Sequence, residues 1–340
     1  MKKIFISIIL PVIFLIYLAG CGSDSIITPV ITQTPTQSPT GSPTATPTPE
    51  PTQGGKWEFQ KSGTSEYLFG LDFVDSMNGW ATGTYGTIVH TADGGNTWIS
   101  QNSGTELMLS NVAAVNSNKV WVAGDQETIF YSSNGGETWN IQYIGNPESI
   151  FYDISFGDST NGWAVGPAGT ILHTSDGINW AYQNSTTTYN ISGVDFIDGR
   201  NGWAVGHGGT ILHTSDGGLT WVQQNSGTSV SLMDVHFADL NHGCVVGAYG
   251  TILLYTSDGG NSWTNSSSPV SARLYGVNFI DPLQGWVVGG GGSILRTTDG
   301  GVNWIAITVA PSISLYSVDF PDASHGWAVG DSGIILKYSP

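Results

Sequence analysis

Tryptophan recurs along this chain about every 41 residues, and this period constrains the fold more than any other feature. All 13 tryptophans belong to two series. The first series is Trp57, Trp98, Trp139, Trp180, Trp221, Trp263 and Trp304; the second is Trp80, Trp121, Trp163, Trp203, Trp286 and Trp327, with Cys244 where one tryptophan is missing. A fixed period of this length indicates stacked copies of one supersecondary unit.

Each repeat contains four short runs of β-branched and aromatic residues. In the fourth repeat these runs are 191–197, 202–205, 210–214 and 221–225, and turns rich in Gly and Asp separate them. Such runs predict short strands, and no segment after the first 20 residues has helical periodicity. Four antiparallel strands per repeat predict an all-β fold in which each repeat is a propeller blade.

The number of blades follows from the first strand of the repeat. It recurs seven times, through Phe73, Ala114, Phe156, Phe196, Phe237, Phe279 and Phe320. The seventh repeat has no fourth strand, whereas residues 57–64 resemble the fourth strands at 98–105 and 221–228. We therefore predict a seven-bladed propeller over residues 56–340, with the N-terminal strand at Trp57 completing the last blade. Closure of the ring would pair backbone groups that an open edge leaves exposed.

A turn of the form Thr-x-Asp-Gly-Gly-x-x-Trp recurs between the third and fourth strands. Its Asp and Trp members are Asp93 and Trp98, Asp176 and Trp180, Asp216 and Trp221, Asp258 and Trp263, and Asp299 and Trp304, while Asn134 replaces Asp in the second copy. The carboxylate can accept N–H bonds within its own turn, and the Trp can cover the hairpin. One turn per blade spreads these residues around the ring. We interpret them as structural Asp-boxes rather than as catalytic or calcium-binding groups.

Asp-boxes also occur in sialidases and other glycoside hydrolases, so catalysis has to be considered. A sialidase-like site gathers three arginines on one carboxylate. The three arginines of this chain, Arg200, Arg273 and Arg296, occupy different positions in the blade and would not converge. A xyloglucanase-like site needs two carboxylates across a cleft, usually between two propellers, and this chain has one propeller. We therefore expect no catalytic residue and no enzyme activity.

Other polar residues give no sign of a metal or cofactor. His90, His173 and His213 share one position in three different blades, which favours packing within each repeat over a metal site. Cys244 takes the place of a Trp and is interpreted as a small buried hydrophobic residue. We therefore expect no cofactor and no metal.

The first 55 residues predict export. Residues 1–20 have a positive start and an apolar stretch, and they end in Leu-Ala-Gly before Cys21, as in a lipoprotein signal peptide. An ordinary signal peptide is the alternative. Residues 21–55 are rich in Thr and Pro, which predicts a disordered linker that could reach up to ~100 Å. The expected location is the cell membrane or outer membrane, with lipid on Cys21 and the head in the periplasm or outside the cell.

The charge and the variable loops restrict the partners. A formal net charge of −17 disfavours nucleic acid. Loops between the second and third strands, and before the first strands, vary most between repeats, and recognition is usually found on such loops. The candidate partner-binding residues there are Tyr85, Asp125, Tyr152, His207, Tyr249, Tyr275, Tyr316 and Asp331. They suit a protein or a glycan partner; the alternative is that the tyrosines only fill the mouth of the channel.

The repeats as written resemble the photosystem II stability/assembly factor family. The resemblance is carried by Val-Asp-Phe-Ile-Asp at 194–198, Asn-Gly-Trp-Ala-Val-Gly at 201–206 and Gly-Thr-Ile-Leu-His-Thr-Ser-Asp-Gly-Gly-Leu-Thr-Trp at 209–221, and it covers residues 56–340. It implies a seven-bladed, non-catalytic scaffold that docks a newly made membrane protein during assembly, and its cyanobacterial members are often lipoproteins. The family's arginine-rich contact patch has no counterpart among three scattered arginines.

The leading hypothesis is a membrane-anchored propeller that binds a protein partner, such as a subunit of a membrane complex, in an assembly or chaperone-like role. The alternative is a cell-surface propeller that binds carbohydrate or resembles a sialidase- or xyloglucanase-type glycoside hydrolase. A third is a structural surface protein or adhesin.

Overall fold

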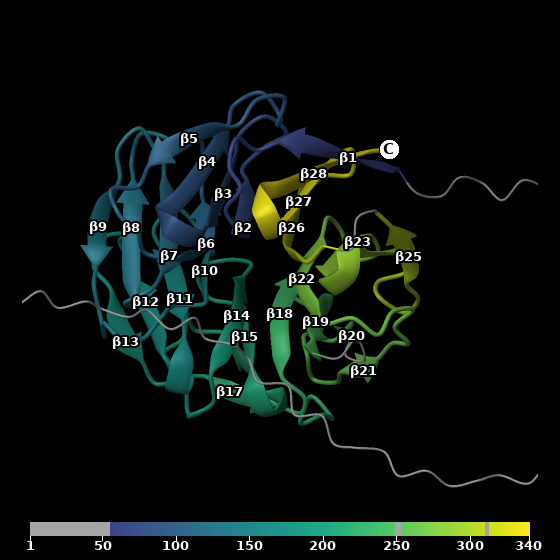
Figure 1. The fold of residues 1–340 in the computed structure, drawn as a ribbon. Helices are drawn as coiled ribbons and strands as arrows, with labels where there is room; N and C mark the ends of the chain where they lie inside the picture. The colour runs from purple at the N-terminus through teal and green to yellow at the C-terminus, as the bar shows by residue number, and fades with distance from the viewer. Residues whose placement is uncertain (1–54, 249–252, 310–312) are drawn as a thin grey trace, which may run out of the picture. The chain divides into compact units, whose positions relative to one another are not determined.

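The computed structural model describes residues 55–248, 253–309 and 313–340, which form a ring of seven four-stranded antiparallel sheets (Figure 1). The predicted seven-bladed propeller is therefore confirmed. The predicted signal peptide at 1–20, Cys21, nearly all of the 21–55 linker and Tyr249 lie outside the described residues. In the described part of the chain, no helix has the length and apolar character needed to cross a membrane.

Each blade runs from an inner first strand to an outer fourth strand. The first strands are β2 (Leu68–Phe73), β6 (Leu109–Ala114), β10 (Asp153–Phe156), β14 (Ile191–Phe196), β18 (Leu232–Phe237), β22 (Leu274–Phe279) and β26 (Leu315–Asp322). The second strands are β3 (Gly79–Gly83), β7 (Val120–Gly124), β11 (Gly162–Val165), β15 (Gly202–Gly206), β19 (Gly243–Gly247), β23 (Gly285–Gly289) and β27 (His325–Gly330). The second strands are almost wholly buried because a neighbouring blade covers each of their faces.

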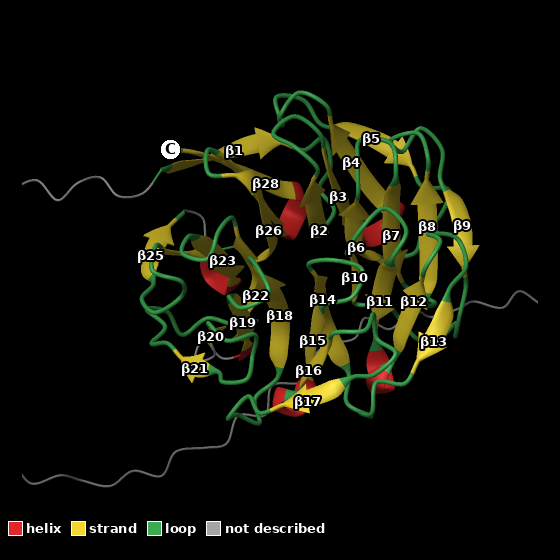
Figure 2. Cartoon of the chain, turned by 180° about the vertical axis from the view of Figure 1, so that it is seen from behind, coloured by secondary structure: helices red, strands yellow, loops and turns green. Residues whose placement is uncertain are grey.

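The third strand of each blade is largely buried, whereas the fourth strand is largely exposed. The third strands are β4 (Thr87–Thr91), β8 (Thr128–Ser132), β12 (Ile171–Thr174), β16 (Ile211–Thr214), β20 (Leu253–Thr256), β24 (Ser293–Thr297) and β28 (Ile334–Ser339). The fourth strands are β5 (Ile99–Asn102), β9 (Asn140–Tyr143), β13 (Ala181–Gln183), β17 (Val222–Gln224), β21 (Thr264–Asn265), β25 (Ile305–Thr308) and β1 (Lys56–Lys61). Figure 2 shows that strands and loops make up nearly all of the ring, with short 3₁₀ turns between second and third strands.

The last blade contains strands from both ends of the propeller, as predicted. Strand β1 pairs with β28 over the six residue pairs from Lys56↔Ser339 to Lys61↔Ile334. Trp57 packs edge-on against Phe320, with ring centroids 5.7 Å apart, and is only 7% exposed. The N-terminal strand therefore closes the ring through both its backbone and its indole.

Stacked aromatic rings join neighbouring blades. Trp163 and Trp203, in second strands, stack on Phe196 and Phe237 in the first strands of the next blades, with centroids 3.4 Å apart in both pairs. Trp327 stacks in the same way on Phe73 across the closure, at 3.7 Å. Each indole is fully buried or nearly so, and each removes a large apolar area from water. The tryptophan period thus corresponds to the contacts between blades.

A glutamine in the fourth strand forms a second link between blades, which the sequence analysis did not identify. The Nε2 of Gln224 donates to the carbonyl of Gly259 in the next Asp-box at 3.0 Å. The Oε1 of Gln224 accepts from Trp263 Nε1 at 3.2 Å. Gln101, Gln142 and Gln183 donate to the equivalent glycine carbonyls. These four turns are therefore held by the preceding blade as well as by their own hydrogen bonds.

Replacement of Gln224 by Ala should lower the free energy of unfolding by about 1–3 kcal/mol, because the Gly259 carbonyl and the Trp263 indole both lose a partner. Gln223→Ala is the matched control, since Gln223 is exposed on the same strand. Urea unfolding of both variants measures the difference. An equal loss for the two substitutions would contradict the proposed link.

Candidate partner-binding face and central channel

The seven predicted partner-binding residues that the structure describes lie on one side of the ring, here called the mouth face. It carries the connections into the first strands and the 3₁₀ turns η1 (Thr84–Gly86), η2 (Pro167–Gly169), η3 (His207–Gly209), η5 (Gly290–Gly292) and η6 (Asp331–Gly333). The Asp-boxes lie on the opposite side, because they connect the other ends of the third strands. The repeated Asp-box turns are therefore on one side of the ring, and the loops whose sequences vary between blades are on the mouth face.

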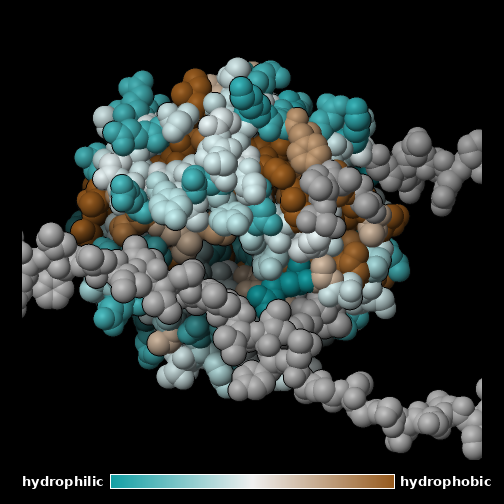
Figure 3. Space-filling model, viewed as in Figure 1, coloured by the Kyte–Doolittle hydropathy of each residue, from teal (hydrophilic) through white to brown (hydrophobic). Residues whose placement is uncertain are grey.

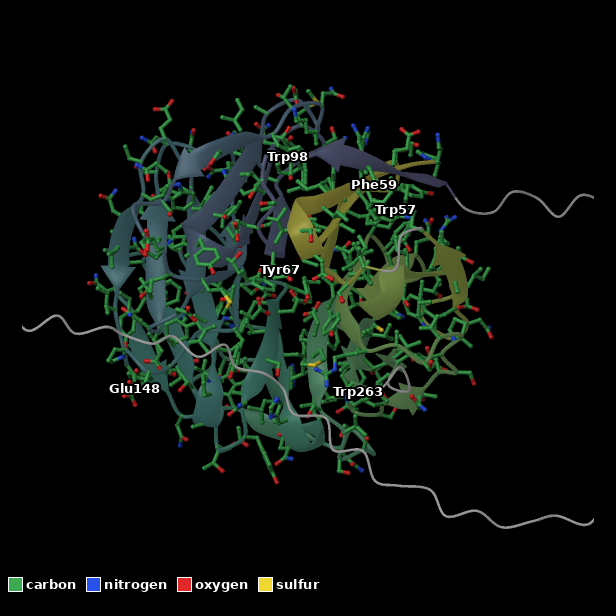
Figure 4. The ribbon with its side chains drawn as sticks, viewed as in Figure 1. Trp57, Phe59, Tyr67, Trp98, Glu148 and Trp263 are labelled. Carbon is green, nitrogen blue, oxygen red and sulfur yellow. The ribbon has the colours of Figure 1, made fainter. Side chains whose placement is uncertain are left out.

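Four aromatic side chains form a continuous series around part of the inner edge of this face, here called the aromatic arc. Its ring contacts are Tyr67 with Phe69 (centroids 6.4 Å apart), Phe69 with Tyr316 (5.1 Å) and Tyr316 with Tyr275 (5.2 Å). Figure 4 shows Tyr67 near the centre of the ring, and 48% of this side chain is exposed. The arc therefore offers aromatic surface beside the channel.

The structure brings three of the predicted residues together at this arc. Tyr316 donates its hydroxyl to Asp331 Oδ1 at 2.7 Å, and Asp331 Oδ2 accepts from the backbone N–H of Ser314 at 2.8 Å. Burial and the hydrogen bond to Asp331 raise the pKa of the Tyr316 phenol. With Tyr275 in contact with Tyr316, blades six and seven contribute a fixed unit of two tyrosines and one carboxylate.

The remaining predicted residues lie elsewhere on the mouth face. Tyr85 is 72% exposed and has a φ of 52°, a left-handed backbone that is strained for a bulky residue. Asp125 accepts from the Met108 backbone N–H at 3.2 Å, and burial raises its pKa, as burial also does for Tyr152. His207 is exposed on η3. Within the described ranges, no ring contact or side-chain hydrogen bond joins these four residues to the aromatic arc.

Sequence reasoning missed two members of the arc and the whole lining of the channel. Tyr67 and Phe69 lie just before and within β2, at positions where other blades have different residues. The channel contains a cavity of about 280 Å³ lined by the first strands, and Figure 3 shows the surface hollowed near the centre of the ring. Its ionisable and amide side chains are Asp72, Asn111, Asp153, Asp195, Asp234, His236, Asn278 and Asp319.

The channel aspartates connect neighbouring first strands. Each carboxylate accepts a backbone N–H from the next blade: Asp72 from Ala114 (2.6 Å), Asp153 from Val194 (2.7 Å), Asp195 from Phe237 (2.7 Å), Asp234 from Val277 (2.9 Å) and Asp319 from Phe73 (2.8 Å). These bonds satisfy edge N–H groups that would otherwise be left unpaired in the wall of the channel. The aspartates therefore have a structural role inside the ring.

The same aspartates are held at raised pKa. Burial raises the pKa of Asp153 and of Asp319 to about 6. Burial together with a neighbouring carboxylate raises the pKa of Asp72 and of Asp234 well above the usual range. Among the described residues that line the cavity there is no lysine or arginine, so no fixed positive side chain opposes these shifts. The channel wall is therefore rich in carboxylates and poor in cations.

The channel aspartates do not form a metal site, since no three His, Cys, Asp or Glu side chains in the described ranges come close enough to hold one ion. His90, His173 and His213 instead stack on Trp80, Trp163 and Trp203 of their own blades, with centroids 4.5–4.8 Å apart. Cys244 is fully buried, and burial raises the pKa of its thiol.

The Asp-box carboxylates are occupied within their own turns. Asp216 Oδ1 accepts from the Thr220 backbone N–H at 2.9 Å and from the Thr214 hydroxyl at 2.8 Å. Asp93, Asp176, Asp258 and Asp299 make equivalent bonds. These bonds lower the pKa of Asp216. One such turn in each of five blades places the carboxylates around the rim, not in a common site.

The three arginines occupy three kinds of position. Arg200 lies in the turn between β14 and β15, and Arg273 directly precedes β22. Arg296 is in β24, where its guanidinium carbon lies 5.5 Å from the Trp286 ring centroid. Arg200 is on the side opposite the mouth face, whereas Arg273 is on it. These positions give no arrangement of three arginines around one carboxylate.

Comparisons with known proteins identify related chains. The sequence matches a family model described as "Photosynthesis system II assembly factor YCF48" at residues 50–143, 100–172, 144–226, 219–313 and 268–339. No curated protein sequence matches the chain. A structure titled "YCF48 bound to D1 peptide" is similar, with a TM-score of 0.70 and 21% identity over 84% of this chain and 95% of that one.

Two further solved structures show how widely the fold is shared. YCF48 from Cyanidioschyzon merolae has a TM-score of 0.70 and 24% identity, over 84% of this chain and 98% of that one. Virginiamycin B lyase from Staphylococcus aureus has a TM-score of 0.73 but 15% identity, over 84% of this chain and all (100%) of that one. At these identities the structural likeness establishes the fold alone, since one propeller fold carries many functions.

Proposed function

Because this chain belongs to the photosynthesis system II assembly factor YCF48 family, we propose that its propeller binds a segment of a partner protein during the assembly of a protein complex. The family match covers the propeller from residue 50 to residue 339. A structurally similar family member is described as bound to a D1 peptide, which supports a polypeptide as the kind of ligand. The proposed partner is a subunit of a membrane complex.

The observation that carries this proposal is the aromatic arc with Asp331 at the mouth of the channel. Aromatic residues beside a fixed hydrogen-bonding group are typical of sites that anchor protein partners. Tyr316 and Asp331 are held in place by their mutual 2.7 Å hydrogen bond, so this part of the surface is formed before the partner arrives. The binding face proposed here therefore centres on Tyr67, Tyr275, Tyr316 and Asp331.

The proposed role is non-catalytic. The Asp-box carboxylates are used in their own turns, and the channel carboxylates are used between blades. Neither set leaves a carboxylate pair free in a cleft, as glycoside hydrolysis requires. These arrangements favour a scaffold over a hydrolase.

We further propose that the protein is exported and anchored by lipid on Cys21, with the propeller held away from the membrane by the residues before Gly55. This rests on the sequence of residues 1–55. Mass spectrometry of the N-terminal peptide tests it: an acyl-modified Cys21 would support the anchor, and a free N-terminus at another residue would refute it.

A photo-cross-linking amino acid at position 67 should capture one protein partner in cells. Tyr67 is 48% exposed in the aromatic arc. The matched control is position 219, because Leu219 is 83% exposed on an Asp-box turn at the opposite side of the ring. Mass spectrometry of the cross-linked products should find a partner only from position 67.

Equal cross-linking from both positions would contradict binding at the mouth face. Absence of any protein partner, together with retention of the purified protein on a cell-wall glycan column, would favour the carbohydrate-binding alternative.

A further inference from the structure

We propose that the partner segment carries an arginine or lysine side chain, which stacks on the aromatic arc and points into the carboxylate-lined channel. This inference rests on the proposed function, since it names the chemistry of the segment that the mouth face would bind. It assigns recognition to positive charge on the partner and negative charge on this chain.

The charge of the mouth face supports a basic ligand. The partly or fully exposed carboxylates of its loops are those of Glu66, Glu106, Asp125, Glu148 and Asp331. Among the described residues, the same loops carry one arginine, Arg273, while Lys61 ends the outer strand β1. A cleft with one sign of charge and low-dielectric walls attracts ligands of the opposite sign.

The aromatic arc supplies contact area suited to a cation. A guanidinium or ammonium group within about 6 Å of an aromatic ring is attracted to its face, and arginine is found there more often than lysine. Phe69 and Tyr316 lie with centroids 5.1 Å apart, and Tyr67 extends the aromatic surface outward. Asp331 adds a hydrogen-bond acceptor beside the arc. Its Oδ1 accepts one hydrogen bond from the Tyr316 phenol, and an ionised carboxylate oxygen can accept a second.

The wall of the channel contains an acceptor without a partner. Asn278 is only 9% exposed and lines the cavity, and its Oδ1 accepts no hydrogen bond. Its Nδ2 donates to Asp319 Oδ1 at 3.0 Å. A buried acceptor left unpaired destabilises the folded protein. The N–H donors of an entering basic side chain would satisfy Asn278 and face the Asp319 carboxylate.

Binding of a cation should be linked to protons. Asp153 and Asp319 have pKa values of about 6, raised chiefly by burial, and no lysine or arginine lines the cavity among the described residues. A bound guanidinium favours the ionised carboxylates and therefore lowers these pKa values. Protons are then released on binding, so affinity should fall as the pH decreases through about 6. His236 also lines the cavity.

Selection from a random decapeptide display library on the purified propeller at pH 7.5 tests the inference. The selected peptides should be enriched in Arg or Lys at one position at least about threefold over the library. Replacement of that residue by uncharged citrulline or norleucine should weaken binding about tenfold, equivalent to ~1.4 kcal/mol. Affinity should also fall several-fold between pH 7.5 and pH 5.5.

Two matched substitutions locate the site on the folded protein. Tyr67→Ser should weaken binding of the selected peptide, whereas Leu219→Ser on the opposite side of the ring should leave its affinity unchanged. Both side chains are exposed, so both variants should fold. Selected peptides without a basic residue, or binding that is insensitive to citrulline and to pH, would overturn the inference. In that case, cross-linking to a partner from position 67 would still support the proposed function. Failure of both experiments would refute both the proposed function and the basic partner residue.

Discussion

A propeller that lacks residues 55–62 should unfold at a temperature lower by about 10 °C or more. The deletion removes all six residue pairs between β1 and β28. It also removes the Trp57 indole from its contacts with Phe320 and Tyr338, and loss of a buried Trp side chain alone costs about 3–5 kcal/mol. The exposed edge of β28 would in addition carry unpaired backbone groups.

Differential scanning calorimetry of the propeller measures this change. A chain that lacks residues 22–54 is the control, and it should keep the unfolding temperature of the full chain. A peptide of residues 55–64 added in excess should restore most of the lost stability, because it can bind in the open blade. An unchanged midpoint after deletion of 55–62 would contradict closure by β1.

The free energy of unfolding should rise by about 3 kcal/mol or more when the pH is lowered from 7.5 to 5. The pKa of Asp153 is about 6 in the folded protein, because of burial, against 3.8 for an ordinary aspartate. A carboxyl group with a raised folded pKa takes up protons more readily in the folded state, so its cost to stability at neutral pH disappears as the pH falls through 6. At pH 5, one unit below this pKa, Asp153 alone contributes about 1.4 kcal/mol. Asp319, whose pKa burial also raises to about 6, contributes as much, and the raised pKa values of Asp72 and Asp234 add to the gain.

The other channel aspartates act in the same direction, and the turn aspartates act in the opposite direction. Although burial opposes it, hydrogen bonds from Asn161 and Thr160 lower the pKa of Asp158 to about 2. Its contribution is present above pH 4 and is lost as the pH falls through 2. Stability should therefore be greatest near pH 4–5.

Guanidinium unfolding at a series of pH values measures this profile. In the Asp153→Asn variant, the gain between pH 7.5 and pH 5 should shrink, because one titrating group is removed. The Asp158→Asn variant should keep that gain and alter only the acid side of the curve. A stability that rises from pH 5 to pH 7.5 in the unmodified protein would show that the channel carboxylates are not held at raised pKa.

Most of the fold could be predicted because the same strand and turn pattern occurs in seven copies of the repeat. The sequence that follows Trp57 resembles the sequences that follow Trp98 and Trp221, so its place as the fourth strand of the last blade could be inferred without coordinates. The hydrogen bonds between the fourth-strand glutamines and the Asp-boxes of the next blade could not be predicted. Gln224 and Gly259 are 35 residues apart, and only the geometry of the ring brings the amide to that carbonyl.

The candidate site was predicted less completely than the fold. Tyr275, Tyr316 and Asp331 were expected on one face, and the structure places Tyr316 in contact with the other two. Phe69 was not predicted because it is the one phenylalanine at a position where β22 and β26 have tyrosine, although it occupies the same place in β2 that Tyr316 occupies in β26. The channel aspartates lie among apolar residues in five of the first strands, a pattern that does not distinguish a solvated face from the wall of a narrow channel.

Placement of the closing strand also determines when the molecule can finish folding. Strand β1 is synthesised before every other part of the ring, yet its partner β28 is the last strand to be made, and Lys56 pairs with Ser339. Contacts between residues so far apart in the chain form slowly, because a long loop must close first. During that interval the apolar side chain of Trp57, which is only 7% exposed in the finished ring, has no blade to cover it. A cell that makes this protein therefore has to protect one specific segment from aggregation until the seventh repeat arrives.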